Sequence, residues 1–235
     1  MYANEFTISP LGDSALIIDF ANVIDEGINK KVSGIFHKLK ALSLPCIRDI
    51  VPAYSSLVVH FDVFAITRKT LINKTAFEIV SEQLKQMIKD YAETALPRSR
   101  FIKIPVCYSE KYAPDIIEIA EKKKIAVAEI IRLHTEKKYR VYMIGFLPGF
   151  AYMGETDEKI SMPRKAEPRL RVEAGSVGIA GMQTGIYPLD SPGGWQIIGK
   201  TPVILFNKEK DEPVLLQPGD EIEFYSITES EFTNY

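Results

Sequence analysis

The feature that most constrains this chain is a glycine-rich stretch, VEAGSVGIAGMQTGIYPLDSPGGWQIIGKTP at 172–202, which holds half of the 14 glycines. Glycine at this density is expected where the backbone needs a positive φ or where another group approaches it closely. The residues between the glycines are mostly β-formers, namely Val177, Ile179, Ile186, Trp195, Ile197 and Ile198. A second run of glycine and aromatic residues, GFLPGFAYMG at 145–154, precedes it. Together the two runs predict short strands and tight turns that meet around one surface site.

Size and charge exclude several classes of protein. The chain has 235 residues and a formal net charge of −2, so we expect no general attraction to nucleic acid or to an anionic membrane. The N-terminus has no signal-peptide pattern, and no window supplies the ~18–20 apolar residues of a membrane span. Cys46 and Cys107 lie far apart beside hydrophobic residues, which indicates reduced structural thiols. We therefore expect a cytoplasmic protein with no nucleic-acid or membrane partner.

The first part of the chain, residues 1–96, alternates strand and helix patterns. Strands are predicted at 6–9, 15–20, 47–51 and 56–61, and helices at about 25–42 and 75–95. Asp25 is suited to cap the first helix. The apolar stripe of the second helix consists of Phe77, Val80, Leu84, Met87 and Tyr91. We expect a ferredoxin-like type of α+β domain, in which two helices cover one four-stranded antiparallel sheet.

The second part of the chain reads as a β-rich domain. The run Leu96–Ser99 ends the second helix pattern, which gives predicted domains at 1–96 and 97–235. A strand at 101–108, helices at 114–121 and 126–135 and a strand at 140–144 follow. Beyond Gly145 no helical periodicity remains, and strands are predicted near 169–172, 176–180, 183–187, 195–199, 202–206, 213–216 and 221–227. Short strands with glycine and proline turns favour a barrel or a sandwich, in an α+β protein overall.

One motif is rejected on its context. The segment Gly194–Thr201, GWQIIGKT, matches the P-loop pattern GxxxxGK[ST]. A phosphate-binding loop needs a strand before it and a helix after it, whose N-terminus points at the phosphates. Here the residues inside the match are themselves strand-like, and Pro202 biases Thr201 away from the helical region. We therefore predict that Lys200 is not a nucleotide-binding lysine.

The histidines and cysteines suggest no metal site and no catalytic pair. His134 shares a predicted helical face with Val127, Ile130 and Ile131. The simpler interpretation is a structural histidine at a helix end, stabilised by the helix dipole or by a carbonyl, and a catalytic role is the alternative. Three scattered histidines and two cysteines give no metal-ligand spacing. The catalytic residues therefore stay unidentified.

A basic set, Arg164, Lys165, Arg169 and Arg171, lies between the two glycine-rich runs. In a strand, Arg169 and Arg171 would point to the same face. Guanidinium groups suit carboxylate or phosphate oxygens, so we predict that Arg164, Arg169 and Arg171 meet a small anionic substrate. The alternative is pairing on the surface with Glu155, Glu167 and Glu173.

Two further groups of residues are candidates for binding. Neutral hydrogen-bonding and aromatic residues alternate with glycine and proline, and the predicted substrate-binding set among them is Gln183, Tyr187, Ser191, Gly193 and Trp195. The alternative is that the turn at 191–195 only closes a barrel corner. An apolar loop is costly to leave in water, so either a partner or internal packing is expected to cover Phe146, Pro148, Phe150 and Tyr152.

The sequence resembles the family of the 5-oxoprolinase B subunit, also called KipI or allophanate hydrolase subunit 1. The resemblance rests on YMIGFLPGFAYMG at 142–154, PR at 163–164 and AGSVGIAGMQTGIYPLDSPGGWQIIGKTPVILF at 174–206. The shorter runs GDSAL, PAYSSLVVHFD and EIIRLH extend it over nearly the whole chain. Two residues depart from the family pattern: Glu173 stands where proline is usual, and Lys200 where arginine is usual. An arginine at that position agrees with rejecting the P-loop.

The resemblance implies an α+β domain followed by a cyclophilin-like β-barrel, and a role that depends on partners. The B subunit is similar to one half of a biotin-dependent carboxyltransferase domain and pairs with a homologous C subunit. Together with a third, A-type subunit, the pair forms an ATP-dependent enzyme that opens 5-oxo-L-proline to glutamate. Phosphorylation of the lactam oxygen would make the amide electrophilic enough for water to attack. The resemblance implies that this chain is a non-autonomous part of the enzyme and is inactive alone. ATP would be used by the complex, and the chain itself has no certain cofactor.

Two other functions follow from the same resemblance. KipI-type members inhibit a sporulation sensor histidine kinase by binding its dimerisation helices, which would make the partner a kinase. Allophanate hydrolysis, the third function, rests on an older family name. The polar residues of the glycine-rich stretch favour a part in the enzyme, because a kinase inhibitor has little need for a polar pocket floor.

Overall fold

The computed structural model describes residues 6–68, 73–89 and 99–235. The chain divides into two compact units, Met1–Arg98 and Ser99–Tyr235. The predicted boundary between residues 96 and 97 lies outside the described residues. Each unit has its own hydrophobic core.

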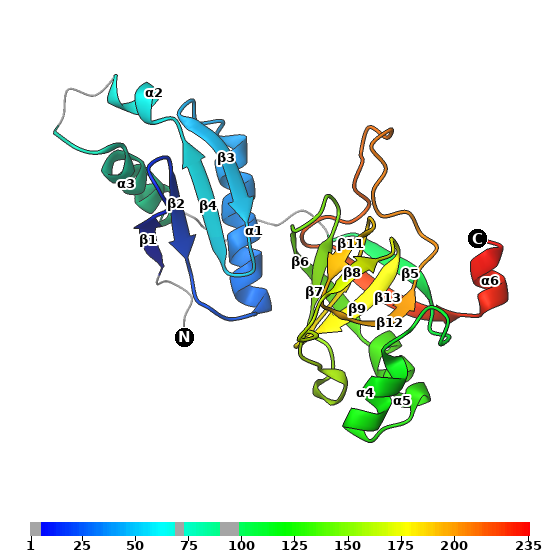
Figure 1. The fold of residues 1–235 in the computed structure, drawn as a ribbon. Coiled ribbons are helices and arrows are strands. Elements are labelled where there is room, and N and C mark those ends of the chain that lie inside the picture. The colour runs from blue at the N-terminus through cyan, green and yellow to red at the C-terminus, as the bar shows by residue number, and fades with distance from the viewer. Residues whose placement is uncertain (1–5, 69–72, 90–98) are drawn as a thin grey trace. The chain divides into compact units, whose positions relative to one another are not determined.

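The N-terminal unit is a four-stranded antiparallel sheet with helices (Figure 1). Its strands stand in the order β1 (Thr7–Pro10), β2 (Ala15–Asp19), β4 (Ser56–Phe61) and β3 (Ile47–Pro52), and its helices are α1 (Glu26–Ala41), α2 (Val63–Thr67) and α3 (Ala76–Lys89). A ferredoxin-like domain runs β-α-β-β-α-β. That type is not confirmed, because in the described residues the strand beside β2 at the edge is β1, which precedes β2 in the chain.

The two long helices form as their sequences predict. The Asp25 carboxylate caps α1 by accepting a hydrogen bond of 2.8 Å from the Ile28 backbone N–H. The buried side chains of α1 include Val32, Ile35 and Leu39, and those of α3 include Val80, Leu84 and Ile88. Tyr91, the last member of the predicted α3 stripe, lies outside the described residues. Helix α2 was not predicted.

The C-terminal unit is a closed barrel of seven strands (Figure 1). The barrel strands are β5 (Phe101–Cys107), β6 (Lys138–Ile144), β7 (Ala151–Gly154), β9 (Ser176–Ala180), β10 (Gln183–Ile186), β12 (Gln196–Lys200) and β13 (Glu221–Ile227). They stand in the order β10-β7-β6-β13-β5-β12-β9. All pairs are antiparallel except β13 with β5, which run parallel from Glu221 opposite Phe101 to Ile227 opposite Cys107.

Smaller elements surround the barrel. They are the helices α4 (Ile116–Lys123), α5 (Val127–Thr135) and α6 (Glu229–Thr233), the 3₁₀ turn η1 (Glu158–Ile160) and a two-stranded sheet of β8 (Arg169–Val172) and β11 (Ser191–Gly193). Strands β7 and β11 and helix α6 were not predicted. The predicted strands at 202–206 and 213–216 are wrong, because these segments share only the isolated bridge between Phe206 and Val214. The predicted α+β class and the barrel are confirmed.

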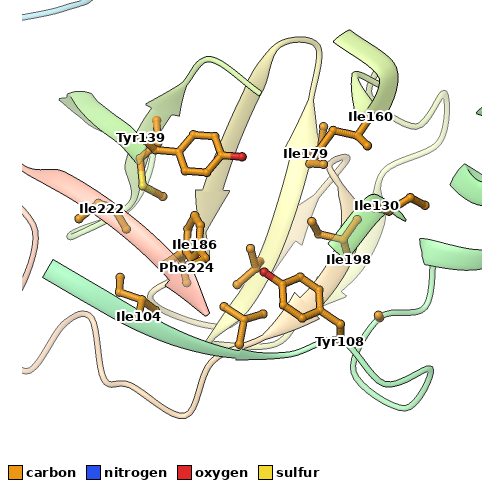
Figure 2. Packing of buried hydrophobic residues seen from close by; sticks show 14 of the residues in the cluster. Ile104, Tyr108, Ile130, Tyr139, Ile160, Ile179, Ile186, Ile198, Ile222 and Phe224 are labelled. Atoms are coloured by element: carbon orange, nitrogen blue, oxygen red, sulfur yellow. The ribbon is translucent and has the colours of Figure 1, made fainter. Parts of the chain in front are cut away.

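The barrel interior is filled by side chains rather than open. Isoleucines from several strands meet Tyr108, Tyr139 and Phe224 there, as Figure 2 shows. Cys46 and Cys107 are both free thiols, as predicted. Within the described ranges, no helix has the length and apolar character needed to cross a membrane. Because the interior is packed, a binding site of this unit would lie outside the barrel core, on its outer wall or at its ends.

Candidate functional site

His134 is a structural residue of the barrel interior. Its Nδ1 lies 2.7 Å from the Tyr108 hydroxyl and its Nε2 lies 2.9 Å from Thr184 Oγ1. Because the Thr184 hydroxyl donates its hydrogen to the Gly178 carbonyl at 3.1 Å, it must accept from Nε2–H, and Nδ1 then accepts from Tyr108. Burial lowers the pKa of His134 from 6.5 to about 3. The neutral imidazole thus joins α5 to the barrel wall, although through side chains rather than the helix dipole or carbonyl expected from the sequence.

The P-loop match is a strand, as predicted. Residues 196–200 form β12, which pairs with β9 and β5. No helix follows in the described residues after β12 until α6. The Lys200 ammonium forms an ion pair with Glu173. These two residues are the two departures from the family pattern, and the ion pair gives Lys200 a local partner that is not a nucleotide.

Aromatic side chains gather on the outer face of the barrel wall. In β7, Ala151 and Met153 point into the barrel core, so their neighbours Phe150 and Tyr152 face outward. Phe150 packs there with Tyr187 and Trp195, and Tyr152 packs against this cluster. We call this set, Phe150, Tyr152, Tyr187 and Trp195, the aromatic platform. It lies over strands β7, β10, β9 and β12, because Gly185 and Gly178 approach its side chains and Ile197 belongs to the same cluster.

The rings of the platform pack edge to face. The Phe150 ring centroid lies 5.3 Å from that of Trp195 and 5.2 Å from that of Tyr187, at 83° in both pairs. Tyr152 lies 5.8 Å from Trp195. Gly185 in β10 makes room for them, since a Cβ there would lie 3.0 Å from the Phe150 and Trp195 rings. The absence of a side chain at Gly185 thus allows close approach, but the groups that approach are aromatic rings of the same chain.

The two phenols of the platform stay protonated at neutral pH. Burial raises the pKa of Tyr152, while the positive charge of Arg164 acts in the opposite direction. Burial also raises the pKa of Tyr187, against a hydrogen bond from the Trp195 backbone N–H and the charges of Arg164 and Arg169. Both hydroxyls are therefore neutral groups beside a basic residue.

A buried carboxylate, which the sequence analysis did not single out, binds two of the four residues of the basic set. Asp115, at the start of α4, is only 1% exposed. Its Oδ1 accepts hydrogen bonds from Lys165 Nζ at 2.8 Å and from Arg169 Nη2 at 2.5 Å. Its Oδ2 accepts one from the Ile197 backbone N–H at 2.6 Å. Asp115 thereby ties α4, the basic segment and β12 together.

The remaining arginines have different partners. Arg171 is exposed and forms an ion pair with Asp190 at 2.7 Å. Arg164 is also exposed, and its guanidinium lies 6.0 Å from the centroid of the Trp195 ring. The structure therefore brings Arg164 to the aromatic platform but does not bring Arg171 there. Arg169 is bound to Asp115, and its positive charge acts to lower the pKa of Tyr187.

The other predicted substrate-binding residues, Gln183, Gly193 and Ser191, lie in strands β10 and β11 and differ in their surroundings. Gln183 is half-buried in β10, opposite Gly154 and Ala180 of the neighbouring strands. Gly193 lies in β11 opposite Arg169. Ser191 is buried, and its hydroxyl has no hydrogen-bond partner in the described residues, a state that it shares with Nη1 of Arg169. The β8–β11 pair thus adjoins the platform.

The predicted partner-binding loop is only partly exposed. Phe146, at a φ of 69°, is 61% exposed and stands edge-on to Phe150 at 5.6 Å. Pro148 is exposed as well, and Tyr152 is half-buried. Phe150 is only 1% exposed, so its assignment as a partner-contact residue is corrected to platform floor. A partner can therefore reach only the exposed apolar residues Phe146 and Pro148 of this loop and part of Tyr152.

The outer face of the barrel is therefore the candidate site. It combines the exposed cation Arg164 with the half-buried Tyr152 above the buried rings of Phe150, Tyr187 and Trp195, so what it can offer a ligand is a positive charge backed by aromatic side chains. In the described residues, no group of three histidine, cysteine or acidic side chains could hold a metal ion. The buried Asp115 could not be found from the sequence, because its partners lie up to 82 residues away along the chain.

A known protein family matches most of the chain. The family described as carboxyltransferase domain, subdomain C and D, matches residues 6–216. The 5-oxoprolinase B subunit of Bacillus subtilis is 39% identical over 235 residues, which cover 98% of this chain and 96% of that protein. The 5-oxoprolinase B subunit of Escherichia coli O157:H7 is 35% identical, and the match covers 91% of this chain and 93% of that protein.

Solved structures match as well. A conserved uncharacterised protein from Pyrococcus horikoshii is 41% identical with a TM-score of 0.55, covering 96% of this chain and 100% of that one. A protein solved in several crystal forms is 32% identical with a TM-score of 0.77, but this chain spans only 40% of its length. The Kluyveromyces lactis urea amidolyase shares the fold, with a TM-score of 0.77 at 20% identity, and this chain spans 15% of it.

Proposed function

Because the chain belongs to the family of the carboxyltransferase domain, subdomains C and D, we propose that it is the B subunit of an ATP-dependent 5-oxoprolinase. In this function it opens 5-oxo-L-proline to L-glutamate together with the A and C subunits. The observation that carries the proposal is the 39% identity to a 5-oxoprolinase B subunit over nearly the full length of both chains. Relatives that act on urea support it less, since this chain matches only 16% of the putative urea carboxylase of Emericella nidulans.

The outer face of the barrel agrees with this proposal. 5-Oxoproline is a small lactam that carries one carboxylate, and the exposed Arg164, beside the half-buried Tyr152, offers a cation for that group. The platform is one wall of a site, and a docked C subunit would supply the opposite wall. The exposed Phe146 and Pro148 would then be covered by that partner.

The chain contributes to an enzyme and does not act alone. Its buried histidine is held between Tyr108 and Thr184 and is unable to act as a base near a substrate. In this proposal ATP is bound at the level of the complex, and Lys200, which lies in a strand and pairs with Glu173, forms no P-loop for it in this chain. Oxyanion and phosphate charge that develops in the reaction would be met by arginine and backbone N–H groups.

Reconstitution tests this proposal. The purified chain is mixed with the A and C subunits from the same source, and glutamate formation is followed with ATP and 5-oxoproline present. We expect turnover only when all three chains and both substrates are present. Full turnover in a mixture that lacks this chain would overturn the proposal. The alternative from the sequence, a kinase inhibitor, instead predicts a stable complex with a sensor histidine kinase and reduced autophosphorylation in the absence of 5-oxoproline.

A further inference from the structure

The five basic residues between positions 164 and 200 differ in what neutralises them. Lys165 and Arg169 bind Asp115, Arg171 binds Asp190 and Lys200 binds Glu173. Arg164, in contrast, forms no ion pair with any residue in the described parts of the chain; its contact is the Trp195 ring. Arg164 is therefore the cation of this segment whose hydrogen-bonding fork is left for a ligand.

Arg164 has packed neighbours on one side. Its guanidinium lies over Trp195, which is buried and held in turn by Phe150 and Tyr152. The chain enters this position from the bridge between Met162 and Gly181 and continues to Lys165, whose ammonium is bound to Asp115. A cation–π contact uses none of the hydrogen-bond donors of a guanidinium, so the N–H groups of Arg164 stay free to donate.

The surroundings strengthen the attraction of Arg164 for an anion. A charge beside a large apolar surface is screened less than one in open water. The two nearby phenols, Tyr152 and Tyr187, keep their protons because burial raises their pKa. They consequently add no negative charge that would compete with a ligand for the guanidinium.

From this geometry we propose that Arg164, backed by the buried ring of Trp195, is the subsite that binds the oxyanion of a small substrate. The proposal rests on the proposed function for the identity of the substrate. The oxyanion is the carboxylate of 5-oxoproline or a phosphate oxygen of ATP, two sources that share one recognition chemistry. Arg169 and Arg171 are excluded as the main contact, because Asp115 and Asp190 already hold them.

Steady-state kinetics of the reconstituted complex test this subsite. Arg164→Gln removes the charge and the fork, and we expect KM for the substrate that supplies the oxyanion to rise roughly tenfold to a hundredfold, the scale of a charge-assisted hydrogen bond. Arg164→Lys keeps the charge without the fork, and its KM is expected to lie between that of the wild type and that of Arg164→Gln. The matched control is Arg132→Gln, which removes an exposed arginine of α5 that pairs with Glu129 and Glu136, and it should leave both KM values unchanged.

The two sources of the oxyanion are separated by measuring both substrates. A rise in KM for 5-oxoproline with KM for ATP unchanged assigns the carboxylate, and the opposite result assigns the phosphate. If the carboxylate is bound, Arg164→Gln should also lose the preference for 5-oxoproline over its carboxamide, which has no charge.

The failure of this inference differs from the failure of the proposed function. If the wild-type complex turns over 5-oxoproline and Arg164→Gln has the same two KM values at an unchanged melting temperature, the subsite is wrong and the function stands. If Arg164→Gln raises KM but also lowers the melting temperature as far as Trp195→Ala does, the effect is structural and the subsite is likewise overturned.

Discussion

Gly193 and Tyr187 are neighbours only because Gly193 has no side chain. A Cβ built on Gly193 would lie 2.3 Å from the Tyr187 hydroxyl oxygen and 2.8 Å from two carbons of its ring. The Tyr187 ring is buried against Phe150, so an added Cβ would have to displace a packed ring. The contact connects the small sheet of β8 and β11 to the platform.

Gly193→Ala should therefore displace Tyr187 and destabilise the barrel unit. Overpacking of this kind costs about 1–3 kcal/mol, which lowers the melting temperature by several degrees in a chain of this size. Gly194→Ala is the control, because the nearest atom to its added Cβ lies at an ordinary 3.7 Å. Thermal unfolding followed by circular dichroism measures both variants. Equal melting temperatures for the two would contradict the packing described for Tyr187.

Asp115→Asn should destabilise the protein strongly. The substitution keeps the shape of the side chain but removes the charge that binds Lys165 and Arg169. Breaking a buried ion pair by removing one partner costs about 3–5 kcal/mol. Asp190→Asn is the matched control, since its pair with Arg171 is exposed and only a small change is expected. Urea unfolding of the two variants gives the comparison, and a loss for Asp115→Asn no larger than for the control would refute the role of Asp115.

Stability should fall as the pH is lowered from neutrality, in part through His134. Its pKa is about 3 in the folded chain and 6.5 when exposed, so between these values the unfolded chain binds a proton that the folded chain does not. The free energy of unfolding then decreases by at most about 1.4 kcal/mol for each pH unit below 6.5. In His134→Gln, which has no titrating ring, unfolding free energies measured between pH 4.5 and 6.5 should follow a flatter curve. An unchanged slope would show that His134 titrates normally.

Lys200→Ala should leave the use of ATP intact. The lysine lies in β12 and pairs with Glu173, and a strand offers no cradle of N–H groups for phosphates. KM for ATP in the reconstituted complex is expected to stay within about twofold of wild type. Loss of nucleotide binding by the isolated variant chain, measured by calorimetry against wild type, would restore the P-loop interpretation.

Local patterns were sufficient to predict much of the fold. The capped helix α1, the strands around Gly178 and the rejection of the P-loop each depended on neighbouring residues alone. Strand β7 was missed because its outward Tyr152 is aromatic and its inward Ala151 and Met153 are apolar, so the run has no alternation of polar and apolar residues. Helix α6 was missed because it is short and has no buried residue.

The site was less predictable than the fold. The sequence placed Arg164, Tyr187 and Trp195 in one candidate site, and the structure brings these three together. It could not distinguish Arg164 from Arg171, because the partner of each depends on contacts across the tertiary fold. Nor could it show that the glycines make room for rings of the same chain, since close approach to a ligand needs the same absence of a Cβ.

The parallel pairing of β13 with β5 has a consequence for how the protein is made on the ribosome. The N-terminal unit, with its own core, can fold while the rest is still being translated. Strand β5 emerges next but has no neighbour on one side until Glu221–Ile227 leaves the exit tunnel. A nascent chain stalled before that point would present open strand edges, so chaperone capture during translation should concentrate on this interval.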